Sequence, residues 1–187
     1  MSLNFTENRR IAWVVLAVSV LVSVFLLGGG ALGRERRSVM KVFNDGTNPS
    51  SDIRYSMDAY LDDAAEAASI MANEAELHMG ESDLVNQTLS NAALIGEDTA
   101  DLDARYRAYT DLKSQAEKLY NNMYGAVTGD ALKSFKLAYD NFWGCDDMLG
   151  RDGYHKLAKN YNSLISGFPG GIVATLTRQG SLNTFGG

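Results

Sequence analysis

The sequence predicts an all-α protein, in which an N-terminal transmembrane helix is followed by an antiparallel helical bundle of long helices. Three observations lead to this fold class. Residues 11–32 form a run of twenty-two amino acids without a charge. No proline lies between Pro49 and Pro169, so long helices are not interrupted there. Within that span, apolar side chains recur at steps of three and four, the period of an amphipathic helix.

The run from Ile11 to Leu32 is long enough to cross a membrane. A helix rises about 1.5 Å per residue, so twenty-odd residues match a hydrocarbon core of roughly 30 Å. Ser19 and Ser23 are the only polar side chains in its first seventeen positions, and arginines stand close to both of its ends. We therefore expect the lipid bilayer to be one partner of this chain, through a single-pass anchor.

Two other interpretations of this region follow from its residues. Arg9 and Arg10, the apolar stretch and a small-residue site at 31–33 resemble a signal peptide, although seventeen apolar residues exceed the usual length of about 7–15. Residues 28–33 also satisfy the pattern G-x-G-x-x-G, with Asp52 downstream, as in dinucleotide-binding folds. That fold requires a short strand and further βαβ units, and the sequence shows no such pattern. A retained anchor is the interpretation we adopt.

Beyond the anchor, the composition describes an acidic domain. The chain has a net charge of −6, but residues 1–37 carry five Lys or Arg against two Asp or Glu, which leaves residues 38–187 at −9. An acidic surface is not expected to bind nucleic acid, because phosphate neutralisation needs a basic face. Turn-forming residues at 44–51 separate the anchor region from the bundle. The predicted segments are a short N-terminus (1–10), the transmembrane helix (11–32), a juxtamembrane basic segment and linker (33–50), the helical bundle (51–169) and a partly ordered tail (170–187).

The bundle is predicted to contain five helices joined by short linkers. Glycines and capping residues give their approximate ends. The expected helices run from Ile53 to a stop at Gly80 after a cap at Ser50, Ser51 or Asp52, from Ser82 to Leu94, from Leu102 to Met123 after a cap at Asp98 or Thr99, from Asp130 through Trp143, and from Arg151 to Phe168. The stretch containing Gly144, Gly150 and Gly153 is expected to be loosened.

No group of residues predicts catalysis, a metal site or a cofactor. Cys145 is the only cysteine, so an intrachain disulfide and a thiolate zinc site are excluded, and two following acids disfavour its thiolate. Glu74 and His78 share a helix face, but a metal site needs more ligands than this pair provides. The acidic run from Asp58 to Glu66 is interpreted as a solvated face, because calcium loops place their ligands on a turn. We therefore predict that the chain is not an enzyme.

The most specific part of the sequence is the segment 151–169. Its aromatic residues Tyr154, Tyr161 and Phe168 are spaced by seven, as in a coiled coil, so they lie near one line of a helix and predict core packing. Pro169 disfavours helical geometry at Phe168 and is expected to end the helix.

This segment resembles the closing segment of the LemA-like family of bacterial proteins. The residues that match in identity and spacing are Arg151, Tyr154, Tyr161, Asn162, Ile165, Phe168 and Pro169. His155 stands where the family has an asparagine, and a Gly-Phe step after Phe168-Pro169 is absent. The resemblance covers about residues 151–174. It implies a membrane helix followed by an antiparallel helical bundle, and it implies no activity and no catalytic residue.

Two functions are compatible with these features. The first is a membrane-anchored interaction or scaffold module, which binds a protein partner or its own copies. The alternative is a sensor-like bundle in which tyrosines line a small-molecule pocket. Four Lys or Arg follow the anchor within ten residues, at 34, 36, 37 and 41, against two before it, which slightly favours a cytoplasmic domain.

Overall fold

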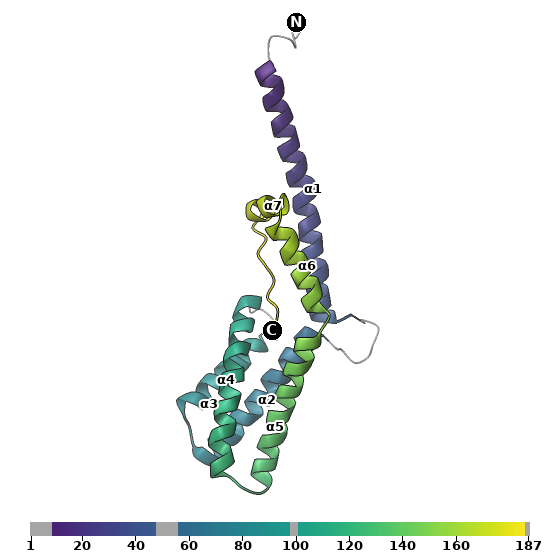
Figure 1. Ribbon diagram of the computed structural model, residues 1–187. Coiled ribbons are helices and arrows are strands. Elements are labelled where there is room, and N and C mark those ends of the chain that lie inside the picture. Colours follow the sequence, from purple (N-terminus) through teal and green to yellow (C-terminus); the bar gives the residue numbers. More distant parts are fainter. Residues whose placement is uncertain (1–8, 48–55, 98–100, 186–187) are drawn as a thin grey trace. The chain divides into compact units, whose positions relative to one another are not determined.

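The computed structural model describes residues 9–47, 56–97 and 101–185, without the side chains of residues 9–11, 21 and 24–27. All elements in these ranges are helices, which confirms the all-α class (Figure 1). They are α1 (Arg9–Asp45), α2 (Met57–Met79), α3 (Asp83–Ile95), α4 (Leu102–Ala126), α5 (Asp130–Arg151), α6 (Tyr154–Ser166) and α7 (Gly170–Thr177). The predicted helix start at Ile53 and the predicted caps at 50–52, 98 and 99 lie outside the described residues.

Within the described residues, no helix is both long enough and apolar enough to cross a membrane. The first helix, α1, does not end with the apolar run but continues through the basic segment to Asp45. Residues 33–45 are therefore helical, where the sequence predicted a basic segment and linker. The sequence did not predict that Val39 and Phe43 are buried; they stand four residues apart on one helix face.

The chain forms two compact units. One consists of residues 1–40 and 157–182, and the other of residues 41–156 and 183–187. The first unit contains most of α1, most of α6 and all of α7, and the second contains α2 to α5. The predicted bundle boundary at residue 169 thus does not coincide with a boundary between the units.

In the second unit, α2 packs on α3, α4 and α5, and α3 packs on α4 (Figure 1). The buried face of α2 is rich in alanine, which lets neighbouring helices approach closely. Its buried residues are Met57, Leu61, Ala64, Ala65, Ala67, Ala68, Met71, Ala72 and Ala75. Larger side chains from α4 and α5, among them Tyr109, Leu112, Phe135 and Phe142, are also fully buried.

Two of these helices begin at serine caps. The hydroxyl oxygen of Ser56 accepts a hydrogen bond from the Ala59 N–H at 3.1 Å, and that of Ser82 accepts one from Val85 at 3.3 Å. Each satisfies a backbone donor that the first turn leaves unpaired. The helix start at Ser82 was predicted, whereas Ser56 is the cap of α2 in place of the residues at 50–52.

The fifth helix is longer than predicted. It continues through Gly144 and Gly150 to Arg151, because a helical glycine costs only about 1 kcal/mol relative to alanine. Burial of Phe142 and Leu149 on either side of Gly144 outweighs that cost. The next helix, α6, begins at Tyr154, whose N–H donates to the Asp152 carboxylate at 2.7 Å. It ends at Ser166, two residues before the predicted end.

The segment after Pro169, which the sequence predicted to be a partly ordered tail, begins with a helix. Residues 170–177 form α7, and the chain continues to Phe185 with Leu182 and Phe185 buried. Glycines allow α7 to pack closely. A Cβ atom at Gly170 would lie 2.0 Å from the Leu164 carbonyl oxygen, so only glycine fits the turn after α6.

The glycines of the first helix also allow close packing. A Cβ atom at Gly29 would lie 2.9 Å from Thr177 Cγ2, and one at Gly28 would lie 3.4 Å from Val173 Cγ2, so α7 rests on this part of α1 (Figure 1). Because residues 28–33 lie inside a helix, they do not form the strand–turn–helix of a dinucleotide-binding fold.

Candidate functional site

A groove of about 450 Å³ lies between α2 and α5 in the second unit. Small residues from both helices line it, namely Ala67 of α2 together with Gly144 and Cys145 of α5. A Cβ atom at Gly144 would meet no other atom within 4 Å, so the missing side chain leaves open space. The groove exists because these positions carry little or no side chain where the two helices pack.

Three carboxylates line this groove: Asp63 and Glu66 of α2 and Asp140 of α5. No Lys or Arg is among its described lining residues. The ion pairs of the described part of the chain do not include any of these three carboxylates. The groove therefore offers negative charge that a cationic ligand is able to neutralise.

Apolar side chains complete the lining. Ile70 is 41% exposed and Met148 is 42% exposed, one on each helix of the groove. Exposed apolar side chains rimmed by polar groups are a feature of interaction surfaces. Methionine adapts its shape to different ligands, because its side chain is unbranched and flexible.

The thiol of Cys145 lies in this groove and remains protonated. Burial raises its pKa, and the negative charge of Asp63 raises it further. The acid that acts on the thiol is thus on the facing helix, whereas the sequence pointed to its two neighbours at 146 and 147. A protonated thiol is a poor nucleophile and a poor metal ligand.

Asp146, next to the groove in sequence, contacts two residues of α4. Its Oδ1 atom accepts a hydrogen bond from the Tyr109 hydroxyl at 2.5 Å and forms an ion pair with Lys113 Nζ at 2.8 Å. Burial and the Asp146 carboxylate together raise the pKa of Tyr109 far above its ordinary value of 10.0. This cluster joins α4 to α5.

A second cluster, around the buried Arg105, joins α4 to α2. The guanidinium of Arg105 is buried and binds Asp58 at 2.6 Å and Asp62 at 3.3 Å. It also lies 6.0 Å from the ring centroid of Phe43, a cation–π distance. The sequence interpretation treated Asp58 and Asp62 as part of a solvated face and did not identify Arg105 as their partner.

The two histidines occupy ordinary structural positions. His78 and Glu74 form the predicted i, i+4 pair at 3.6 Å, and Glu74 also accepts a hydrogen bond from Ser134. The ring nitrogen Nε2 of His155 lies 2.5 Å from the carbonyl oxygen of Leu149. Among the described residues, no three or more His, Cys, Asp or Glu side chains are arranged to hold a metal ion.

Several residues of the segment 151–169 bind the end of the chain. In the first unit, Asn162 forms hydrogen bonds with the backbone of Leu182, and the Tyr161 hydroxyl donates to Gln179 at 3.5 Å. In the second unit, the Tyr154 hydroxyl donates to the carbonyl oxygen of Asn183 at 3.0 Å. Both tyrosines are fully buried, as predicted.

The other residues of this segment have different environments. Arg151 forms an exposed ion pair with Asp147 at 2.7 Å, and Ile165 is half-buried. Phe168 is 88% exposed, so the prediction that it packs in the core is wrong. The heptad line holds only while the helix continues, and α6 ends before this residue. Pro169, at the start of α7, is also exposed.

Comparisons of the chain with protein-family models, with curated proteins and with solved structures find no match.

Proposed function

We propose that this protein is a membrane-anchored helical-bundle interaction module, in which the groove between α2 and α5 binds a basic amphipathic helix of a protein partner. The observation that carries the proposal is a set of three carboxylates arranged around exposed apolar side chains, with no ion pair to any of the three among the residues that the structure describes. The likeness of residues 151–169 to the LemA-like family is consistent with a module of this kind.

Charge and shape select the partner. Ile70 and Met148 would contact the apolar face of the incoming helix, while Asp63, Glu66 and Asp140 would pair with its lysines or arginines. A helix seated in a groove is a recurrent mode of peptide recognition, and complementary charge sets both the rate and the specificity of binding. The small residues Ala67, Gly144 and Cys145 would allow the partner helix to approach closely.

The membrane anchor is supported by the first helix. Trp13, Val14, Val15 and Leu16 point in four successive directions around α1, and each is more than half exposed. A helix that presents apolar side chains on all sides requires an apolar environment. Residues 11–32 supply the length that a bilayer core needs. We infer a single pass, with the basic residues 34–41 favouring a cytoplasmic bundle.

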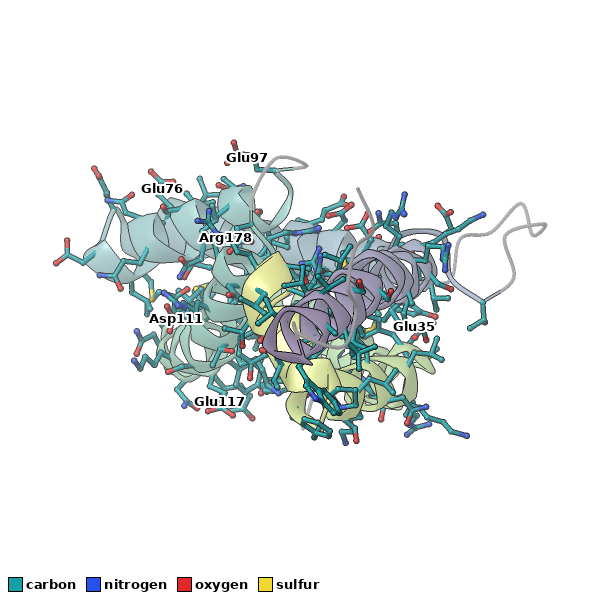
Figure 2. All side chains as sticks on the ribbon, turned by 90° about the horizontal axis from the view of Figure 1, so that it is seen from above. Glu35, Glu76, Glu97, Asp111, Glu117 and Arg178 are labelled. Atoms are coloured by element: carbon teal, nitrogen blue, oxygen red, sulfur yellow. The ribbon has the colours of Figure 1, made fainter. Side chains whose placement is uncertain are left out.

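Binding is tested with two charge-matched triple variants of the full chain in detergent. The groove variant is Asp63→Asn, Glu66→Gln and Asp140→Asn. The control replaces Glu76, Asp111 and Glu117, which lie on the outside of the bundle, by Gln, Asn and Gln (Figure 2). The probe is a synthetic amphipathic helix of leucine and lysine, and its dissociation constant is measured by fluorescence anisotropy.

We expect the groove variant to bind the probe at least roughly tenfold more weakly, which corresponds to about 1.4 kcal/mol. The control should bind as the wild type does. Equal weakening in both variants would mean that net charge alone attracts the probe, and the groove assignment would fail. A photo-crosslinker at Ile70, compared with one at Leu77 outside the groove, then identifies the native partner in cells. Crosslinking to a second copy of the chain would show that the groove serves self-association and does not bind a different protein.

The anchor has its own test. The full chain should remain in the membrane pellet after carbonate extraction, since residues 11–32 would be embedded in lipid. Recovery of a soluble fragment that starts near Arg34 would establish the signal-peptide interpretation instead. Protease accessibility in intact cells then reports which side of the membrane carries the bundle.

The sensor-like alternative receives less support from the structure. A hollow of about 360 Å³ is lined by Tyr106, Tyr109 and Trp143, as a tyrosine-lined pocket requires. The hydroxyl of Tyr109, however, is already bonded to Asp146. A thermal-shift screen of small molecules against the wild type would favour this alternative if a stabilising ligand lost its effect in a Tyr106→Ala variant.

A further inference from the structure

The end of α6 and the exposed side of α7 carry apolar side chains with no protein cover. Phe168 is 88% exposed, and Leu164, Ile172 and Leu176 are each more than half exposed. Ile172 and Leu176 stand four residues apart on α7, so they share one face of that helix. The eighteen residues from 160 to 177 contain no charged side chain. This is an unusually apolar surface for a short helix in contact with water.

The residues of α1 that α7 contacts show where α7 lies along the length of α1. Val173 and Thr177 rest against Gly28 and Gly29, which precede the end of the apolar run at Leu32 by three to four residues. At about 1.5 Å per residue, α7 therefore lies roughly 5–6 Å inside that end. Helices that lie in a membrane interface bury their apolar face about 5–10 Å into the boundary between head groups and acyl chains.

A groove in the same unit opens at this height. It has a volume of about 590 Å³ and is lined by α1, the end of α6 and the start of α7. Its lining is almost entirely apolar and small, and it includes Gly28, Ala31 and Leu32 of α1 together with Leu164 and Phe168. A lipid acyl chain matches this lining, because Ser23 and Ser163 are the only polar side chains among its described residues.

Basic residues lie next to this apolar surface in the sequence. Arg34, Arg36 and Arg37 follow the apolar run, and Arg178 ends α7. By sequence, residues 1–40 and 157–182 contain seven Lys or Arg and two Asp or Glu, a net charge of +5, which leaves −11 for the rest of the chain. Cations placed just beyond an apolar band meet the phosphates of lipid head groups.

We infer that the α6–α7 turn and the exposed face of α7 insert into the membrane interface, with Phe168, Ile172 and Leu176 among the acyl chains. This inference rests on the membrane anchor of the proposed function. It gives Phe168 and Pro169 a role that core packing does not explain. The chain would thus contact the bilayer twice, through the apolar run of α1 and through α7.

The inference is tested by fluorescence quenching on the full chain in phosphatidylcholine–phosphatidylglycerol vesicles. Single cysteines replace Phe168, Ile172, Leu16 or Leu77 in a Cys145→Ser background, and each is labelled with the environment-sensitive dye NBD. All four native side chains are more than half exposed, so the fold should tolerate the substitutions, and far-UV circular dichroism checks this. Lipids that carry a nitroxide on the acyl chain serve as quenchers.

We expect strong quenching and a blue-shifted emission at positions 168 and 172, comparable with position 16 in the anchor, and none at position 77. If the dye at position 16 is quenched but the dyes at positions 168 and 172 are not, as at position 77, the interfacial insertion is overturned and the anchor remains intact. Absence of quenching at 16 would show instead that the anchor itself fails, and the insertion with it.

Discussion

The side-chain amide of Asn162 forms two hydrogen bonds with the backbone of Leu182, both 2.8 Å long. Its Nδ2 atom donates to the Leu182 carbonyl oxygen, and its Oδ1 atom accepts from the Leu182 N–H. One side chain thus satisfies both polar groups of one residue in a segment without regular secondary structure. Leu182 itself is buried, so its backbone has little access to water.

Replacing Asn162 by alanine should release the end of the chain. Two backbone groups would lose their partners, at a cost of about 1–3 kcal/mol. Hydrogen–deuterium exchange of residues 179–185 in the detergent-solubilised protein should become faster. Asn160→Ala is the matched control, because Asn160 is exposed on the same helix and should leave the exchange unchanged. Unchanged exchange in the Asn162 variant would mean that burial of Leu182 alone holds this segment.

Truncation of Tyr161 to alanine should destabilise the protein by roughly 2–4 kcal/mol, as for other large-to-small substitutions in a core. Tyr161→Phe should cost only about 0.5 kcal/mol, since its hydrogen bond to Gln179 is long at 3.5 Å. Thermal unfolding in detergent measures both. Phe168→Ala provides a comparison that removes an exposed aromatic ring, and it should shift the melting temperature little. A wild-type melting temperature for Tyr161→Ala would show that this side chain is not part of the core.

Stability should fall at high pH because of Tyr109. The folded protein keeps this tyrosine protonated, since its pKa is raised by burial and by Asp146, whereas the unfolded chain ionises near pH 10. The free energy of unfolding should therefore decrease above pH 10 by up to about 1.4 kcal/mol per pH unit from this residue, and be unaffected by it below that pH. Urea unfolding between pH 8 and pH 11 measures the slope.

The matched variant for this experiment is Tyr109→Phe. It should be less stable at neutral pH by about 1.5–3 kcal/mol, because the hydroxyl is bonded to a charged group. The difference in the free energy of unfolding between the two proteins should become smaller above pH 10, because only the wild type loses stability through the ionisation of Tyr109. Parallel curves for the two proteins over that range would contradict the assignment.

We predict that lysine cannot take over the role of Arg105. The guanidinium binds Asp58 and Asp62 at the same time, and a single ammonium group lacks that fork. We expect Arg105→Lys to lower the free energy of unfolding by about 1–3 kcal/mol in urea titrations. Arg107→Lys, at an exposed position two residues further along α4, should change it by no more than about 0.5 kcal/mol. Similar effects of both substitutions would show that the two carboxylates do not depend on this arginine.

Elements with local start and stop signals could be predicted from the sequence. The helix expected from Ser82 to Leu94 is found at Asp83–Ile95, since Ser82 caps its first turn and Gly96 follows its last residue. The glycines of α5 misled the interpretation, because whether a glycine ends a helix depends on the burial around it. Gly144 lies between the buried Phe142 and Leu149.

Features that depend on distant residues could not be predicted. Phe185 is buried against Phe43 and Tyr106, which are far from it in the sequence, so the residues around Phe185 gave no sign of these contacts. The candidate groove combines Asp63 with Asp140, and no spacing rule connects positions on different helices. For Phe168 the prediction was wrong for a different reason: the spacing of seven residues continues to Phe168, but the helix ends before it.

The discontinuity of the first unit imposes an order on its assembly during translation. Residues 1–40 leave the ribosome before residues 157–182 have been synthesised, and the whole of 41–156 is made in between. At about 5–20 residues per second, this interval lasts on the order of ten seconds. During that time the glycine surface of α1 has no α7 to cover it. Residues 157–182 therefore complete a unit that residues 1–40 began before the other unit was made.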